Sequence, residues 1–462
     1  MPSKLQHMLS KPFSILTIIA MSFTMMIACK YPSKTYSGKN NDVSYPSYLL
    51  QSNIYEVNVR QYTPEGTFKA FEKSLPRLKE MGVDILWFMP ITPISVQDRK
   101  GVLGSYYAVA DYTAVNPEFG TMDDWKALVN KAHELGMKVI IDWVANHTGA
   151  DNRWIKSNPD FFVKGPDGKL KFAFDWSDTR DLNYWNPVLK DSMIQSMKFW
   201  VTDTKIDGFR CDVAMEVPRS FWEPALAELK KVKSDLFFLA EADDAWIHDA
   251  GFHASYGWNG FHKMKDIAGG KSSARVLDTV LRHLDEKYPQ SYLKMYFTSN
   301  HDENSWNKAD YATMPGAMHA PFAVLTQTWR NTVPLIYAGQ EEPFLDSLSF
   351  FYKDTITFGK YERAPFYKKL LSLRKENPAM AADAGYIKLE SNNDDQVYAY
   401  LREKNGRKVL VVLNLSDKKQ DTDLKGAKID GSALNVFSGK KETLQANQKF
   451  TLEPWGYYVY SY

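Results

Sequence analysis

Residues 205–212 read KIDGFRCD, a short apolar pattern that ends in an arginine and an aspartate. Three other stretches have the same form: KVIIDWVANH (138–147), DLFFLAE (235–241) and YLKMYFTSNHD (292–302). Their apolar parts are typical of strands buried on both faces, the kind found in parallel sheets. Such a strand gains nothing from a carboxylate in its middle, but it tolerates one at its C-terminal end, where strand becomes loop.

Four repetitions of this pattern predict one shared cavity at the strand ends of a parallel α/β fold. The cavity would hold Asp142, Asn146, His147, Arg210, Asp212, Glu241, His301 and Asp302. This set is rich in carboxylates and contains one arginine. It includes neither paired cysteines nor a glycine-rich phosphate loop.

Strand and helix patterns alternate from about residue 53 to 380, with a first strand expected over 54–59. This alternation fits either an open doubly wound sheet or a closed (β/α)8 TIM barrel. No G-x-G-x-x-G follows the first strand, and the site residues are scattered over many strand ends, so the barrel is favoured. Residues 147–187 are too many for an ordinary loop and predict a small inserted subdomain after the third strand.

After about residue 383 the pattern changes to short strands and polar turns, including an Asn405-Gly406 hairpin signal. We expect a C-terminal antiparallel β-sandwich over 383–462, following a catalytic barrel over 48–382.

The N-terminal residues are not expected to belong to the fold. Residues 1–28 combine early lysines with an apolar stretch that ends just before Cys29, which is the pattern of a signal peptide. It resembles a bacterial lipoprotein signal, in which Cys29 would be lipidated and the protein held in the cell envelope, facing periplasm or cell surface. A plain signal peptide or an anchor helix is the alternative. Residues 29–47 are polar and predict a flexible tether.

Length, net charge and composition exclude few classes of protein. The chain has 462 residues and a formal net charge of +2, so nothing indicates nucleic acid as a partner. Aromatic residues make up 14%, which fits either a large aromatic core or stacking platforms for sugar rings. Cys211 is the only cysteine besides Cys29, and we expect it to be a buried thiol, because no Cys–His partnership is evident.

Three convergent carboxylates, Asp212, Glu241 and Asp302, permit two chemistries. They could bind Mg²⁺ or Ca²⁺, or they could supply the nucleophile and the general acid/base of a glycosidase. Arg210 favours the second, because a guanidinium on the same strand face as Asp212 keeps that carboxylate ionised and competes with a metal cation. Glu241 follows four apolar residues, a setting that raises the pKa of a proton donor.

Taken together with several further motifs, these residues show that the chain resembles the alpha-amylase family of glycoside hydrolases. The resemblance extends over roughly residues 50–460. It is carried by DWVANH (142–147), GFRCD (208–212), FLAE (238–241), NHD (300–302), DLN (181–183), GQE (339–341) and GSYYAVADY (104–112).

The resemblance implies a retaining mechanism in which Asp212 is the nucleophile, Glu241 the acid/base, and Asp302 the acid that stabilises the distorted sugar. It also implies that Arg210 positions the nucleophile and that Tyr107, His147 and His301 bind the sugar at the cleavage point.

Two departures concern specificity and metal. The residues after Asp212 are Val213-Ala214-Met215-Glu216, where many starch-cleaving members have Ala-x-Lys-His, so endo-acting starch specificity is put in doubt. The family's calcium sites use positions that correspond to Asn146 and Asp181, and the remaining ligands are not legible. The sequence therefore leaves open whether the protein binds calcium.

We therefore expect an α-glucan hydrolase acting on α-1,4-linked starch or maltooligosaccharides. The alternatives are an α-glucosidase or glucosyltransferase acting on short substrates such as sucrose or trehalose, and a non-catalytic glucan-binding lipoprotein. A metal-dependent phosphotransferase is the weakest hypothesis. Oligomeric state and endo versus exo action are left open.

Overall fold

The computed structural model describes residues 45–289, 291–310 and 312–462. The predicted signal peptide, Cys29 and most of the predicted tether lie outside these residues. Among the residues that the structure describes, no helix combines the length and the apolar character needed to cross a bilayer.

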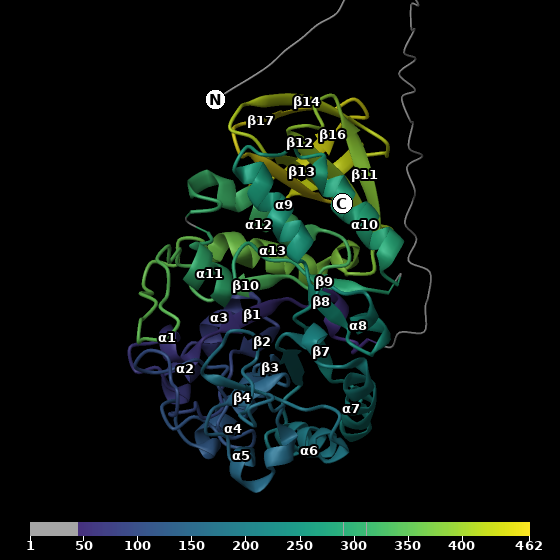
Figure 1. The fold of residues 1–462 in the computed structure, drawn as a ribbon. Helices are drawn as coiled ribbons and strands as arrows, with labels where there is room; N and C mark the ends of the chain where they lie inside the picture. The colour runs from purple at the N-terminus through teal and green to yellow at the C-terminus, as the bar shows by residue number, and fades with distance from the viewer. Residues whose placement is uncertain (1–44, 290, 311) are drawn as a thin grey trace, which may run out of the picture. The chain divides into compact units, whose positions relative to one another are not determined.

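A parallel eight-stranded sheet forms the first part of the fold, in the order β10-β1-β2-β3-β6-β7-β8-β9 (Figure 1). Its strands are β1 (Ile54–Val57), β2 (Ile85–Phe88), β3 (Lys138–Trp143), β6 (Gly208–Cys211), β7 (Phe237–Ala240), β8 (Ala254–Tyr256), β9 (Leu293–Met295) and β10 (Leu335–Tyr337). The two ends of the row meet at a parallel bridge between Lys294 and Thr332. The Val333 amide also donates to the Lys294 carbonyl at 3.0 Å, so the sheet closes into the predicted barrel.

Helices follow the strands in sequence, as the alternating pattern predicts. They are α1 (Val59–Tyr62), α2 (Phe68–Glu72), α3 (Leu75–Met81), α4 (Met122–Glu134), α6 (Pro187–Asp203), α7 (Arg219–Val232), α8 (Trp246–Asp249), α9 (Trp258–Ala268), α10 (Val276–Lys287), α11 (His301–Asn307), α12 (His319–Thr328) and α13 (Ala364–Glu376). Thr121 and Asp124 form a capping box at the start of α4, and the Asn186 side chain caps α6.

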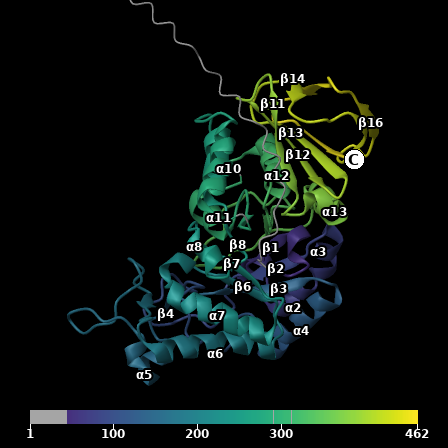
Figure 2. The ribbon, with the colours of Figure 1, turned by 90° about the vertical axis from the view of Figure 1, so that its right-hand side faces the viewer.

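The inserted region after β3 contains a two-stranded antiparallel sheet, β4 (His147–Gly149) and β5 (Thr179–Asp181). The short helix α5 (Trp154–Ser157) lies between them in sequence, and Figure 2 shows this region around the labels β4 and α5. The insertion brings His147 and Asp181 into register as paired residues.

Strands β11 to β18 form a separate antiparallel sheet in the order β16-β15-β18-β13-β12-β11-β14-β17. Their bounds are β11 (Gly385–Ser391), β12 (Val397–Lys404), β13 (Arg407–Asn414), β14 (Gln420–Lys425), β15 (Gly431–Asn435), β16 (Lys441–Leu444), β17 (Lys449–Leu452) and β18 (Tyr457–Ser461). Arg402 joins this sheet to the barrel, since its guanidinium donates to the carbonyls of Thr328 and Trp329 at 2.9 and 2.6 Å. The predicted fold class is confirmed.

Two details of the strand prediction were wrong. The strand expected over 54–59 ends at Val57, because α1 begins at Val59. Strand β8 was not predicted: it comprises only Ala254–Tyr256, and its sequence, unlike those of the equally short β9 and β10, is not part of a longer apolar run.

The buried carboxylate of Asp207, directly before β6, stabilises the end of the barrel at which β6 begins. Its oxygens accept from His133 at 2.7 Å, Lys138 at 3.0 Å and Lys233 at 2.6 Å, and from the Val139 amide at 2.9 Å. Burial alone would raise the pKa of Asp207, but His133 and Lys233 outweigh it and hold that pKa below its usual range.

We predict that Asp207→Asn lowers the free energy of unfolding by about 3 kcal/mol in chemical denaturation at pH 7. This is the lower end for a broken buried pair, because the three basic side chains stay 26–32% exposed. A depressed folded-state pKa contributes its full stabilisation above the unfolded pKa of about 3.9 and loses it as the pH falls towards the folded pKa. The difference from wild type should therefore shrink as the pH falls below about 3.9.

Asp235→Asn is the matched control. Its side chain is 45% exposed and lies 3.8 and 3.9 Å from Lys138 and Lys233, so its loss should cost less than about 1 kcal/mol. Equal losses in the two variants would contradict the importance given to Asp207.

Candidate active site

Arg210 lies at the centre of the predicted cavity and contacts three carboxylates. Its Nη1 lies 2.9 Å from Asp142 Oδ1 and 2.8 Å from Asp212 Oδ1, and its Nη2 lies 2.9 Å from Glu241 Oε2. The Arg210 side chain is fully buried. Sequence reasoning paired Arg210 with Asp212 alone, so the structure gives this arginine a wider role than predicted.

The sheet register explains how these groups meet. Asp142 on β3 is paired with Arg210 on β6, and side chains at paired positions point to the same face. Gly208 lets β6 approach β7 closely, since a Cβ there would lie 1.9 Å from the Phe237 carbonyl oxygen. No other residue type fits at this position.

The carboxylates line one cavity of about 490 Å³, a volume that suits a small ligand. Asp212, Glu241 and Asp302 contribute to its wall together with Tyr107 and His147. The lining also includes Lys100, Ser105, Asp175, Trp176, Asp178, Thr179, Val213, Trp306, Phe350 and Phe351. The structure thus brings the three predicted catalytic acids and two predicted sugar-binding residues to one place.

The pKa values of Asp212 and Glu241 are both raised, and that of Glu241 is the higher. Burial raises the pKa of Asp212 to about 6, against the opposing charge of Arg210. Burial raises the pKa of Glu241 to about 7, again opposed by Arg210. The order is the one that a nucleophile and a proton donor need, with the donor the weaker acid.

Strained backbone follows Asp212 directly. Val213 adopts φ 34° and ψ 48°, in the left-handed region that a β-branched residue rarely enters. Its amide donates to Glu241 Oε2 at 2.8 Å. This bond ties the loop after β6 to the carboxylate at the end of β7, and strain of this kind gathers at functional sites.

His147 presents an unused donor to the cavity. Its Nδ1 accepts from the Asn146 amide at 3.3 Å, so in the neutral ring the proton sits on Nε2. Burial lowers the pKa of His147 to about 3, which keeps the ring neutral. Within the described structure Nε2 is buried and has no hydrogen-bond partner, as expected of a donor whose partner is a ligand hydroxyl.

His301 and Asp302 open helix α11, whose N-cap is Asn300. His301 Nε2 lies 2.8 Å from the Tyr107 hydroxyl and 3.3 Å from Asp302 Oδ2. Burial raises the pKa of Asp302, but the charge and hydrogen bond of His301, together with Arg210 and Trp306, hold that pKa below its usual range.

Glu56 was missed by sequence reasoning. It lies on β1, is fully buried, and its Oε1 is 2.5 Å from His301 Nδ1. Burial opposes the charged ring, but Asp302 and Glu56 together raise the pKa of His301 well above its usual value. The available signal was a carboxylate inside an otherwise apolar strand, Ile54–Val57, because a buried acid is costly unless it has a charged or hydrogen-bonding partner.

The two residues considered for calcium lie apart from this network. The Asn146 amide is used by His147, and Asp181 is partly buried on β5, where burial raises its pKa. Among the described residues no group of three or more His, Cys, Asp or Glu side chains could hold a metal ion. The donor set does not form a side-chain cage for a cation.

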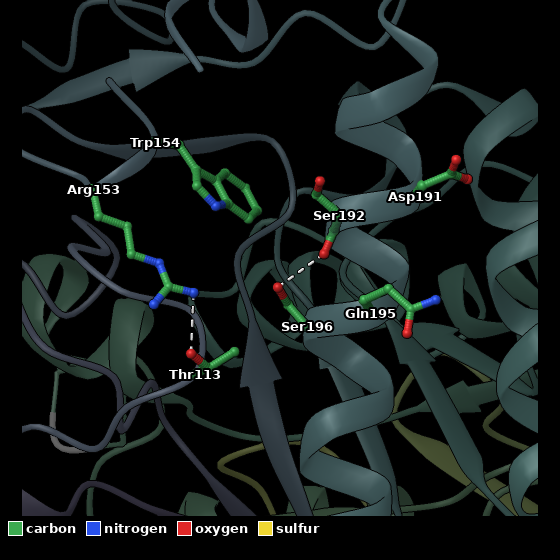
Figure 3. A pocket seen from close by; sticks show the side chains of 7 residues that line it. All are labelled: Thr113, Arg153, Trp154, Asp191, Ser192, Gln195 and Ser196. Atoms are coloured by element: carbon green, nitrogen blue, oxygen red, sulfur yellow. Dashed lines mark hydrogen bonds between the residues drawn. The ribbon is translucent and has the colours of Figure 1, made fainter. Parts of the chain in front are cut away.

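A second cleft lies between α6 and residues 113 and 153–154 (Figure 3). Arg153 is already bonded to Asp111 and Thr113 at 3.0 and 3.1 Å. Trp154 is only 7% exposed, so its ring is not available for stacking. This cleft offers neither a free cation nor an exposed ring.

Comparison with known proteins agrees with the geometry. The profile of the alpha amylase catalytic domain matches residues 31–169 and 170–361, and that of the maltogenic amylase C-terminal domain matches 387–459. The structure is similar to a noncanonic maltogenic alpha-amylase, AmyB, from Thermotoga neapolitana: TM-score 0.82, 32% identity, 90% of this chain and 99% of that one. An alpha-amylase from Lactobacillus plantarum gives 0.80 and 31%, over 90% and 99% of the two chains.

A curated relative, the alpha-amylase MalA of Haloarcula japonica, is 27% identical over 414 residues. That match covers 84% of this chain but only 59% of the relative, so the chain spans less than two thirds of that protein.

We predict that Glu56→Gln lowers the pKa of His301 by about one unit or more, because it removes one of two neighbouring negative charges. NMR titration of the histidine rings measures this shift directly. Glu341→Gln is the control, since Glu341 is equally buried but contacts Tyr55 and Arg77 rather than a histidine. An unchanged His301 titration in Glu56→Gln would show that Glu56 does not set its charge.

Proposed function

The chain belongs to the alpha-amylase family of glycoside hydrolases, and we propose that it hydrolyses α-1,4 bonds of starch or maltooligosaccharides by the retaining mechanism. The observation that carries this proposal is the shared contact of Arg210 with Asp212 and Glu241 at the wall of one cavity. Names of relatives such as the Thermotoga neapolitana maltogenic alpha-amylase support the substrate class.

In the first step Asp212 attacks the anomeric carbon of the bound sugar. Arg210, 2.8 Å away, holds the attacking carboxylate ionised. Glu241 gives its proton to the leaving glycosidic oxygen, which departs as a hydroxyl group. The result is an uncharged glycosyl ester on Asp212 and an ionised Glu241, so the net charge of the site is unchanged.

In the second step a water molecule attacks the same carbon from the face that the leaving group vacated. Glu241 takes the proton of this water, and Asp212 leaves as a carboxylate. Two displacements restore the original α configuration. The raised pKa of Glu241 suits both duties, because the same group must give and take a proton near neutral pH.

The remaining residues bind and polarise the sugar. The Tyr107 ring supplies an apolar face, and His147 Nε2 is the free donor for a hydroxyl. His301 and Asp302 offer a charged donor and a charged acceptor side by side, so they can grip neighbouring hydroxyls of a distorted ring. Charge-assisted bonds of this kind are stronger than neutral ones.

Transfer to a sugar acceptor is the second candidate. The chain lacks the Lys-His pair after Asp212 and has Val213 at the cavity wall, which removes polar contacts on the leaving side. A maltosyltransferase of Rhodospirillum rubrum is among the relatives, at 28% identity over 78% of this chain. Transfer would give products longer than the substrate, whereas hydrolysis gives only shorter ones.

Calcium at Asn146 and Asp181 stays a prediction taken from the family resemblance. Because the described residues do not form a side-chain cage there, no step above is assigned to a metal.

We further propose that residues 1–28 are removed and that lipidated Cys29 holds the protein in the bacterial cell envelope. The n-region, the apolar stretch and the cysteine that follows support this. Cys29→Ser should move the protein from the membrane fraction to the soluble fraction, with an unlipidated N-terminal peptide by mass spectrometry. Cys211→Ser, at a buried core thiol, should leave fractionation unchanged. Identical partition of wild type and Cys29→Ser would refute the anchor.

Azide rescue separates the two proposed carboxylate roles. Glu241→Gln should lower maltooligosaccharide hydrolysis by about 10²–10⁴-fold, since proton transfer is lost. With an α-maltosyl fluoride, which needs no proton donor, this variant plus azide should release the α-glycosyl azide. Asp212→Ala with the same α-fluoride and azide should instead give the β-azide, because azide takes the place of the missing carboxylate and inverts the anomeric carbon once.

Glu303→Gln is the control, because Glu303 is buried beside Asp302 but pairs with Lys265 and does not line the cavity. It should keep activity within a few-fold. NMR of the azide products decides the outcome: a β-azide from Glu241→Gln would contradict a covalent intermediate on Asp212.

A further inference from the structure

A loop that contributes to the lining of the cavity is bonded to other segments on both of its sides. This loop, residues 95–105, follows β2, and we call it the strap. Its residue Lys100 lines the cavity together with Asp212, Glu241 and Asp302.

On one side the strap is bonded to the inserted region. Lys100 Nζ lies 3.2 Å from Asp178 Oδ1, and Asp98 pairs with Arg180. Asp151 Oδ2 accepts from two strap amides, those of Val96 and Gln97, at 2.9 and 3.0 Å. Two ion pairs and two backbone bonds therefore fix this junction.

On the other side the strap is bonded to the loop after β10. The Leu103 amide donates to the Phe351 carbonyl at 3.1 Å. Gly101 allows this approach, because a Cβ there would lie 2.5 Å from Phe351 Cβ. Arg60, buried beneath the strap, donates to the Leu103 and Gly104 carbonyls at 3.3 Å. The strap thus bridges both walls.

The order of strands places the strap relative to the proton donor. In the closed row β10-β1-β2-β3-β6-β7-β8-β9, β7 is the third neighbour of β2, and the fourth would be directly opposite. The strap follows β2 and Glu241 follows β7, so the two lie nearly across the barrel mouth. The leaving sugar must be next to Glu241, and the chain on the other side of the cleaved bond must therefore run toward the strap.

The Lys100–Asp178 pair forms the cavity wall at that end. Asp178 is only 4% exposed, while Lys100 keeps 36% of its side chain accessible. A buried carboxylate beside a half-free ammonium offers an acceptor and a donor to the hydroxyls of a terminal sugar. Trp176, whose ring lies 5.4 Å from that of His147, adds an aromatic surface to the same cavity.

We propose that the strap closes the non-reducing end of the cavity, so that the enzyme removes one or two glucose units from chain ends rather than cutting within chains. This inference depends on the proposed function. It assigns the Lys100–Asp178 pair as the specificity determinant, with terminal hydroxyls of an α-1,4-glucan as its ligand.

The test compares two maltoheptaosides, one free and one chemically blocked at its non-reducing end. Wild type should cleave the free substrate and leave the blocked one nearly untouched. In Lys100→Ala/Asp178→Asn the ratio of blocked to free cleavage should rise by about tenfold or more, the scale on which a pocket wall discriminates. The paired substitution avoids leaving a buried charge unmatched.

Three further results complete the design. Lys100→Ala alone should raise the ratio in the same direction and serves if the double variant unfolds. Lys169→Ala, at an exposed position of the inserted region, should not change the ratio. Products should be one or two glucose units from wild type and longer from the opened variants.

The outcomes separate the two proposals. If wild type cleaves the blocked and free substrates equally, with internal cuts, the strap proposal is wrong and the hydrolase proposal stands. If wild type cleaves neither substrate, the hydrolase proposal itself fails.

Discussion

The site depends on one buried guanidinium that serves three carboxylates. Arg210 is fully buried, contacts Asp142, Asp212 and Glu241, and lies under the rings of Trp87 and Tyr256 at 5.1 and 5.4 Å. Burial makes Asp212 and Glu241 harder to ionise, and the charge of Arg210 opposes this in both. The balance leaves Asp212 the stronger acid and Glu241 the weaker one, which is the difference that a retaining glycosidase needs.

A second cation completes the charge balance on the far side of the cavity. Glu56 and Asp302 flank His301 and keep its ring charged. Five carboxyl groups, those of Glu56, Asp142, Asp212, Glu241 and Asp302, thus surround two cations, and each cation contacts more than one of them. The strap adds a third cation, Lys100, which pairs with Asp178 at the cavity wall.

Much of this arrangement could be predicted from the sequence. The acids at strand ends, the capping box at Thr121 and the insertion after β3 each follow from local pattern, which reports strands, caps and loops. Contacts between distant elements could not be predicted. Arg210 with Glu241 and Lys100 with Asp178 depend on which strands lie side by side in the sheet, and Glu56 with His301 depends on closure of the barrel between β9 and β10. Glu56 was hidden because the first strand was judged by its apolar neighbours, although a buried acid needs a distant partner.

The most direct test of the central claim is the identity of the residue that becomes glycosylated. An activated 5-fluoro-glycosyl fluoride, whose glycosyl-enzyme turns over slowly, can be reacted with wild type, and the protein can then be digested and its peptides weighed. If Asp212 is the nucleophile, the peptide that contains Asp212 should carry one added glycosyl group, located on Asp212 by fragmentation. A label on Glu241 or Asp302, or an active enzyme that never becomes labelled, would contradict it.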